Sequence, residues 1–109
     1  MSSPVPKAIA SYIEAYNSRD EKTALASFSE DALVHDEGKD HRGRKAIGAW
    51  LHETLEKYQP RLTAGPVTVE DAETVVSMTV SGNFPGSPLT LAFHFRMEKE
   101  TIAGLKVLA

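Results

Sequence analysis

The hydrophobic pattern of this chain changes from a helical period to a strand period near Leu62. Before this point, apolar residues recur at helical spacing, first from Val5 to Tyr16 and again from Ile47 to Tyr58. After it, apolar and polar residues alternate, as they do in half-buried strands. Helices followed by a run of hairpin-connected strands predict an α+β fold, with the helices on one face of the sheet.

The helical part of the sequence also contains signals for where each helix begins and ends. Ser3 and Pro4 form a suitable N-cap and first-turn pair, and Asn17 ends this first helix. Asp20 can cap a short second helix. We expect a third helix from about Gly43 to Tyr58, which Pro60 closes.

The strand part predicts a twisted sheet with two different faces. In the strand from Leu89 to Met97, Leu91 and Phe93 share one face, and His94 lies on the other. Such sheets twist strongly. We therefore expect three N-terminal helices packed in a strongly curved, mainly antiparallel sheet, which forms a cone with an internal pocket.

Composition narrows the class of protein. The chain has 109 residues, a net charge of -3 and no cysteine, so we expect a single domain over residues 1–109 without disulfides or thiolate metal sites. It lacks the clustered basic face that nucleic acid requires and any apolar run long enough to span a membrane. The start, MSSPVPKAIASY, does not resemble a signal peptide, so we expect a cytoplasmic protein.

Residues 31–50, DALVHDEGKDHRGRKAIGAW, contain the most informative candidate for chemistry. A short strand from Leu33 ends at Asp36, and a turn at residues 37–38 follows. A carboxylate at the wall of an apolar cavity loses contact with water and becomes a stronger base. The alternative is an aspartate that caps the turn or pairs with Arg42 or Arg44. Because neighbouring strand residues point to opposite faces, His35 faces away if Asp36 faces the pocket.

The order of elements, together with particular motifs, resembles the nuclear transport factor two-like superfamily, in its SnoaL-like and ketosteroid-isomerase-like branches. The resemblance covers essentially the whole chain. It rests on these motifs: DALVHDEG…HRGRKAI, Asn17 to Asp20, Phe28-x-x-Asp31-Ala32 and Gly43-Arg44-x-x-Ile47. Members of this superfamily include isomerases, cyclases, dehydratases, epoxide hydrolases and non-catalytic binding domains.

The resemblance implies roles for particular residues. Asp36 falls on the position of the aspartate that moves the substrate proton in ketosteroid-isomerase-like members. Tyr12 falls on the tyrosine that donates a hydrogen bond to the enolate oxygen, and Tyr16 lies one turn later. The nearest match to the late-strand acid of that family is Phe93, so this acid is missing here. The outer sheet face commonly packs against a second subunit in this superfamily, which implies a homodimer.

Several other residues are candidates for the pocket. We expect Val34, Trp50, Leu91 and Phe93 to line it, although an aromatic or apolar residue on a buried stripe is more often core. If the faces are inverted, His94 or His35 becomes the alternative acid or base. Phe84 lies in the loop NFPGSP, which can form a rim or be only a connector.

A metal site is not expected. His35, Asp36 and His41 superficially suggest one, but their spacing matches no established ligand set.

These patterns lead to two hypotheses. The first is an enzyme of isomerase, cyclase or dehydratase type that needs no cofactor and acts on a small hydrophobic carbonyl compound, with Asp36 as base. The second is a non-catalytic ligand-binding or dimerisation domain of the same fold.

Overall fold

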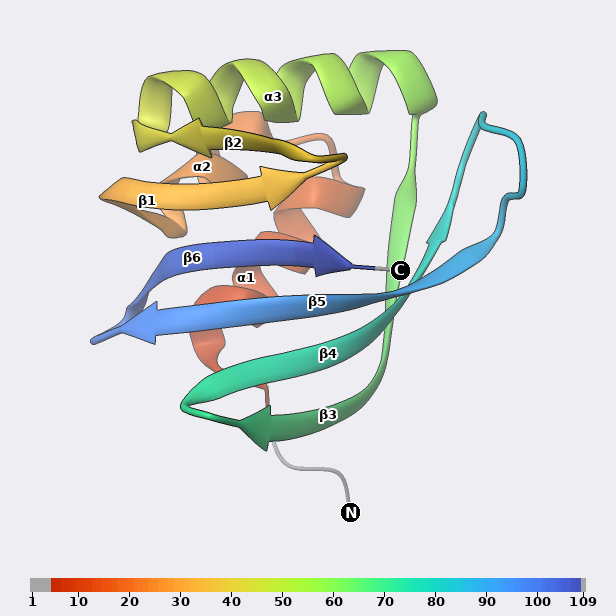
Figure 1. The fold of residues 1–109 in the computed structure, drawn as a ribbon. Helices are drawn as coiled ribbons and strands as arrows, with labels where there is room; N and C mark the ends of the chain where they lie inside the picture. Colours follow the sequence, from red (N-terminus) through yellow and green to blue (C-terminus); the bar gives the residue numbers. More distant parts are fainter. Residues whose placement is uncertain (1–4, 109) are drawn as a thin grey trace.

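The computed structural model describes residues 5–108 and contains three helices and six strands (Figure 1). The helices are α1 (Lys7–Asn17), α2 (Glu21–Ala26) and α3 (Gly43–Tyr58). The strands are β1 (Phe28–Asp36), β2 (Lys39–Arg42), β3 (Arg61–Glu70), β4 (Glu73–Ser81), β5 (Leu89–Glu98) and β6 (Thr101–Leu108).

All six strands form one mixed sheet in the order β2-β1-β6-β5-β4-β3. β1 and β6 are parallel, and every other neighbouring pair is antiparallel. The sheet curves without closing, so β3 and the loop between β4 and β5 rise toward the end of α3 (Figure 1). This architecture confirms the predicted α+β class and the curved, mainly antiparallel sheet.

Most helix boundaries agree with the sequence signals. The side chain of Asp20 accepts a hydrogen bond from the backbone N–H of Thr23 at 3.2 Å, as expected of an N-cap. The predicted bounds of α3, and the end of α1 at Asn17, are confirmed. α1 begins at Lys7 with Pro6 as N-cap, whereas the predicted cap at residues 3–4 lies outside the described residues.

The β1–β2 hairpin differs from the expectation in two ways. β1 is longer than the predicted strand and begins at Phe28, which pairs with Ile102 of β6 across an irregular register. β2 was not predicted, because its sequence KDHR has no apolar residue and low strand propensity. It forms because it pairs with β1 through a two-residue turn at Glu37 and Gly38, both with positive φ. Its charges suit an edge strand.

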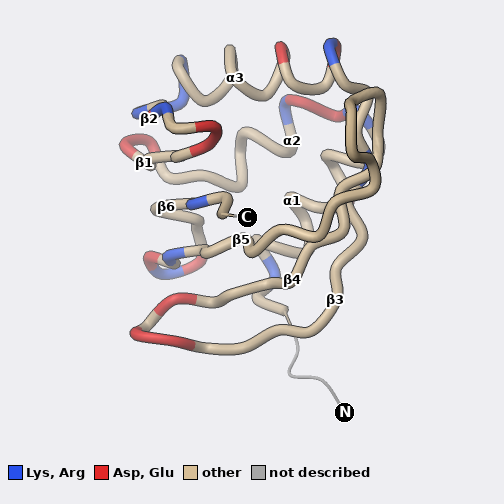
Figure 2. The backbone as a smooth tube through the Cα atoms, turned by 45° about the vertical axis from the view of Figure 1, so that its right-hand side comes forward, with Lys and Arg blue, Asp and Glu red and all other residues tan. Residues whose placement is uncertain are grey.

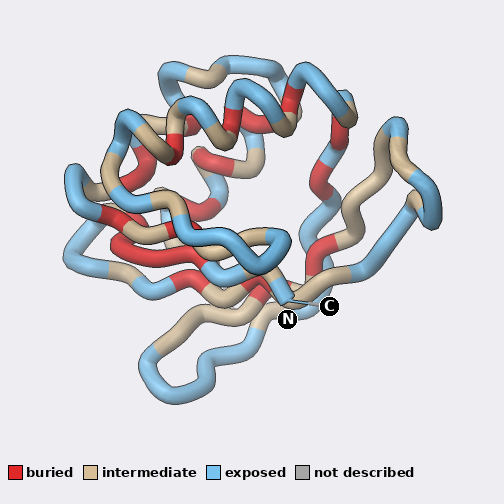
Figure 3. Tube along the Cα trace, turned by 45° about the horizontal axis from the view of Figure 1, so that its top comes forward, coloured by how far each residue is buried: buried red, intermediate tan, exposed pale blue. Residues whose placement is uncertain are grey.

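The core lies between the helices and the concave face of the sheet, where the buried positions gather (Figure 3). The largest fully buried side chains include Tyr12, Phe28 and Phe95, whose rings pack edge to face. The centroid of the Tyr12 ring lies 5.3 Å from that of Phe28 and 6.3 Å from that of Phe95. This aromatic cluster fixes α1 against the sheet.

Two sets of polar contacts fix the elements that surround the open end of the cone. The Asn17 side chain donates to the backbone oxygen of Leu62 and accepts from its N–H, both at 2.8 Å, which joins α1 to β3. The backbone N–H of Asn83 donates to the carbonyl of Tyr58 at 2.7 Å, which holds the β4–β5 loop against the end of α3. A Cβ at Gly82 would lie 2.7 Å from that same carbonyl, so this close approach requires glycine.

Charge is unevenly distributed over the fold. No Lys, Arg, Asp or Glu occurs between Glu73 and Arg96, so most of the β4–β5 hairpin is free of charge (Figure 2). No helix within the described residues is long and apolar enough to cross a membrane. The expected pairing of two chains through the outer sheet face stays a prediction.

Candidate functional site

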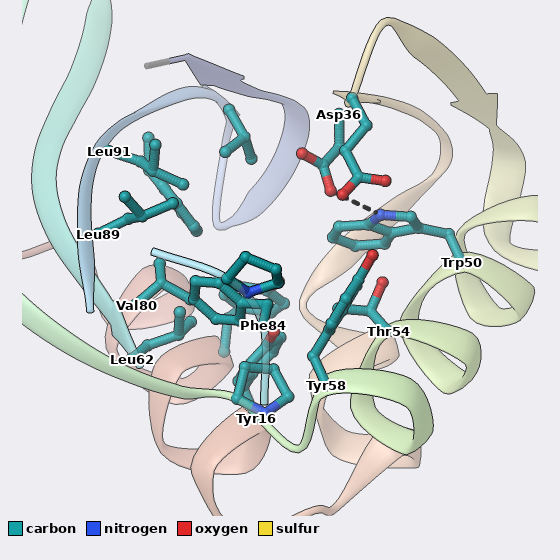
Figure 4. Close-up of a pocket in the computed structure, with 16 residues that line it drawn as sticks. Tyr16, Asp36, Trp50, Thr54, Tyr58, Leu62, Val80, Phe84, Leu89 and Leu91 are labelled. Carbon is teal, nitrogen blue, oxygen red and sulfur yellow. Dashed lines mark hydrogen bonds between the residues drawn. The ribbon is translucent and has the colours of Figure 1, made fainter. Parts of the chain in front are cut away.

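A cavity of about 330 Å³ lies at the open end of the cone, between α3, the end of β1 and the β4–β5 hairpin. This volume is at the lower end of the range for small-molecule pockets. Figure 4 shows two different walls. Asp36, Trp50, Thr54 and Tyr58 lie on one side, and Val80, Leu89 and Leu91 lie on the other.

Asp36 faces this cavity, as the sequence predicts. Its carboxylate Oδ2 accepts a hydrogen bond from the indole Nε1 of Trp50 at 3.1 Å (Figure 4). The alternative pairing with arginine is not observed. Arg42 instead donates to the backbone oxygen of Asp31 and Arg44 to that of Phe28. A neutral donor therefore orients this carboxylate without neutralising its charge.

Tyr12 and Tyr16 bring α1 to the same cavity. Tyr12 is fully buried, and its hydroxyl has no hydrogen-bond partner among the described residues. Burial raises the pKa of Tyr12 well above its ordinary value, and the nearby Tyr16 and Asp36 raise it further. Burial also raises the pKa of Tyr16, against a smaller lowering by Arg19. Both side chains are thus neutral hydrogen-bond donors at physiological pH.

The two buried tyrosines predict a loss of stability in alkali. Since both folded-state pKa values lie above the ordinary value of 10.0, the folded protein keeps protons that the unfolded chain releases. Stability is therefore unaffected below about pH 10 and falls as the pH rises further. We expect the tyrosinate absorbance of Tyr12 and Tyr16 to appear only at a pH at which circular dichroism shows that the protein has unfolded. The Tyr58→Phe variant, in which Tyr12 and Tyr16 are the remaining tyrosines, should behave in the same way. Complete ionisation of all three tyrosines with native circular dichroism would contradict this.

Three of the four predicted lining residues are found on the cavity wall, namely Trp50, Leu91 and Phe93. Val34 is not, which corrects the expectation. It shares the inner face of β1 with Asp36 but is fully buried in the core where α3 packs against β1.

The histidines considered as alternative acids or bases lie away from the cavity. His35 Nδ1 lies 2.6 Å from Asp40 Oδ1 across the β1–β2 hairpin. His94 lies on the outer face of β5, with its Nδ1 3.2 Å from Oε1 of Glu73. The predicted alternation along β1 and β5 places both correctly on the face opposite the pocket.

The sequence did not assign a role in the pocket to two of the residues that line it, Glu37 and Thr54. Tyr58 belongs to the apolar stripe of α3, which was expected to face the cavity, and it lies on the cavity lining. Glu37 could have been found as the residue after Asp36 in a tight turn. Phe84, predicted as part of a rim or connector, does line the cavity, and its ring packs edge to face on Tyr58 at 5.9 Å between centroids.

Comparison with known proteins identifies relatives of this arrangement. Residues 9–105 match the family model of the SnoaL-like domain. A candidate polyketide cyclase from Sinorhizobium meliloti is 32% identical, with a TM-score of 0.90 and 94% of each chain covered. Among curated proteins, none matches this chain.

More distant solved structures share the fold. A protein with a ketosteroid isomerase-like fold from Catenulispora acidiphila, solved in complex with trimethylamine, has a TM-score of 0.83 at 17% identity and covers 97% of this chain and 87% of its own. A cystatin-fold protein from Novosphingobium aromaticivorans has a TM-score of 0.78 at 16% identity. The match covers 100% of this chain and 99% of the Novosphingobium chain.

Proposed function

This chain belongs to the SnoaL-like domain family, and from that membership and its cavity we propose that it binds a small apolar carbonyl compound and moves a proton on it. One observation carries the proposal. The same cavity holds a carboxylate with no ion pair, that of Asp36, and a fully buried hydroxyl with no partner among the described residues, that of Tyr12. Proton transfer next to a carbonyl can use these two groups, the carboxylate as base and the hydroxyl as donor to the enolate oxygen.

The proposed step is proton abstraction from the carbon next to the carbonyl. The Asp36 carboxylate takes the proton, and the electron pair of the broken C–H bond moves into an enolate. The Tyr12 hydroxyl donates a hydrogen bond to the enolate oxygen, with Tyr16 as a second donor one turn along α1. Asp36, now a carboxylic acid, returns the proton to the same carbon, which gives exchange, or, where the substrate has a β,γ double bond, to the γ-carbon of the dienolate, which moves the double bond into conjugation with the carbonyl. Trp50 holds the carboxylate in position throughout.

Binding without turnover is the second candidate function, and one feature favours it. The β5 wall of the cavity presents Leu91 and Phe93 and no second acid. The proposal gives the enolate oxygen two donors, Tyr12 and Tyr16, and neither is a carboxylic acid. Two tyrosines stabilise the enolate less than a tyrosine and a carboxylic acid together would.

Exchange of carbon-bound hydrogen tests the proposal without knowledge of the natural substrate. The assay follows deuterium entering the position next to the carbonyl of apolar ketones in D₂O by NMR, beginning with 2-tetralone. We expect the protein to accelerate exchange over buffer in a saturable manner. We expect Tyr12→Phe to lower that rate about 10²-fold, as loss of an oxyanion donor does.

The same variant controls for folding. Because the Tyr12 hydroxyl has no hydrogen-bond partner in the described part of the chain, Tyr12→Phe should unfold at an equal or higher temperature than the wild type. Equal exchange rates in the two proteins would contradict the donor role. Ketones that bind without any exchange would favour the binding domain.

A further inference from the structure

The cavity that we propose as the active site has an unusual distribution of charge. Its lining includes two carboxylates, Asp36 and Glu37, and no lysine, arginine or histidine. Neither carboxylate forms an ion pair within the described residues. Asp36 accepts only from the neutral indole of Trp50, and the Glu37 side chain makes no hydrogen bond there. Among the described residues, the basic side chains nearest this wall, Lys39 and Lys57, lie in an adjoining hollow that the two carboxylates also line, and neither lysine lines the cavity itself.

Aromatic rings stand beside these carboxylates. Trp50 is hydrogen-bonded to Asp36, and Tyr58 and Phe84 form an edge-to-face pair with an interplanar angle of 88° (Figure 4). The faces of such rings attract cations, most strongly when water is excluded. The protein itself shows this contact, because Lys57 Nζ lies 5.1 Å from the centroid of the Tyr58 ring. Lys57 lines a smaller adjoining hollow of about 90 Å³, which shares Asp36, Glu37, Trp50 and Tyr58 with the cavity, and Lys57 does not line the cavity itself.

The backbone fixes Glu37 at this place. It is the first residue of the two-residue β1–β2 turn and has a φ of 53°, in the left-handed region that glycine and asparagine adopt more easily. The turn thus sets a second carboxylate directly after Asp36, on the lining of the same cavity.

The opposite wall of the cavity is apolar. It is built from Val80, Leu89 and Leu91, which belong to the part of the β4–β5 hairpin without charged residues, between Glu73 and Arg96 (Figure 4). At the buried end of the cavity lies Tyr12, whose hydroxyl has no hydrogen-bond partner in the described chain. An amphiphilic ligand with a cationic end, an apolar body and a carbonyl oxygen matches these three regions.

We infer that the cavity selects carbonyl compounds that carry a cationic amine, with the nitrogen seated between Glu37 and the rings of Trp50, Tyr58 and Phe84. This inference rests on the proposed function only in that the same cavity is the binding site. It adds the class of substrate. The ammonium group faces the acidic and aromatic wall, and the apolar body of the ligand fills the space toward Leu91.

A matched set of ligands tests the charge directly. The cation 3-hydroxyphenyltrimethylammonium and the neutral 3-tert-butylphenol have the same shape, and 3-hydroxybenzenesulfonate carries the opposite charge. Dissociation constants are measured by NMR titration of the labelled protein. We expect the cation to bind about tenfold more tightly than its neutral isostere, with a preference that salt weakens. We expect the sulfonate not to bind.

Variants then locate the origin of the preference. Glu37→Gln should weaken cation binding about fivefold and leave 3-tert-butylphenol unchanged, as expected for loss of one nearby charge. Glu98→Gln is the matched control, because it removes the same charge from an exposed position outside the cavity. Phe84→Leu, which keeps an apolar side chain, should also lower the affinity for the cation alone.

Three results would overturn the inference: equal affinity for the cation and its neutral isostere, no cation binding at millimolar concentration, or equal effects of Glu37→Gln and Glu98→Gln. None of these phenols is a ketone, so the titration is independent of the exchange assay. Ketone exchange without a preference for cations overturns this inference alone. A preference for cations without any exchange supports it and contradicts the proposed proton transfer.

Discussion

Asp36→Asn is expected to abolish most of the α-hydrogen exchange, lowering its rate about 10²–10⁴-fold. The amide cannot accept a proton from carbon, yet its oxygen can still accept the hydrogen bond that Trp50 Nε1 donates at 3.1 Å. The fold and the cavity should therefore stay intact while the base is lost. The measurement compares the exchange rate of the variant with that of the wild type at saturating ketone.

The control for this variant is Asp40→Asn. Asp40 is exposed, lies on β2 and contacts His35 outside the cavity, so its replacement removes the same charge without touching the proposed base. We expect its exchange rate to equal that of the wild type. An Asp36→Asn protein that exchanges within threefold of the wild type would mean that another group is the base.

Phe95→Ala is expected to give the largest loss of stability, about 3–5 kcal/mol in the free energy of unfolding. Phe95 is fully buried on the inner face of β5, with its ring centroid 6.3 Å from that of Tyr12 and 6.1 Å from that of Phe93. Its removal leaves a void beneath α1, which the close packing of the core cannot fill. Denaturation with urea, followed by circular dichroism, measures the change.

Phe84→Ala serves as the matched comparison for this effect. Phe84 is only half buried and lies in the β4–β5 loop, so the same chemical change should cost much less, about 1 kcal/mol. If the two variants lose equal stability, the aromatic cluster under α1 contributes no more to stability than the loop does.

Part of the site follows from local patterns. Neighbouring residues on a strand point to opposite faces of the sheet. This rule places Asp36 on the pocket face if His35 is on the outer face, and it places Phe93 on the pocket face if His94 is on the outer face. The same reasoning was wrong for Val34. Alternation predicts the inner face, but it does not tell whether a neighbouring helix covers that position or leaves it open.

The remaining part depends on contacts between distant segments. β2 has no apolar residue and exists because β1 is beside it, so its sequence alone could not reveal it. Glu37 and Phe84 come from two turns far apart in the chain, and the curvature of the sheet and the bond from Asn83 to Tyr58 bring them to one cavity. No local pattern in the sequence indicates that Glu37 and Phe84 line the same cavity.

The sequence by itself determined the α+β class, the division between helices and strands, the bounds of α3, and the place of Asp36 at the end of a strand. These features depend on hydrophobic period, capping residues and turn residues, which act over a few positions. Only the tertiary structure decided that β1 pairs in parallel with β6, that the Tyr12 hydroxyl has no hydrogen-bond partner within residues 5–108, and that two carboxylates share a cavity wall with aromatic rings. The physical reason is that solvation and pairing of a polar group depend on which distant surfaces meet around it, and the local pattern encodes only which face is buried.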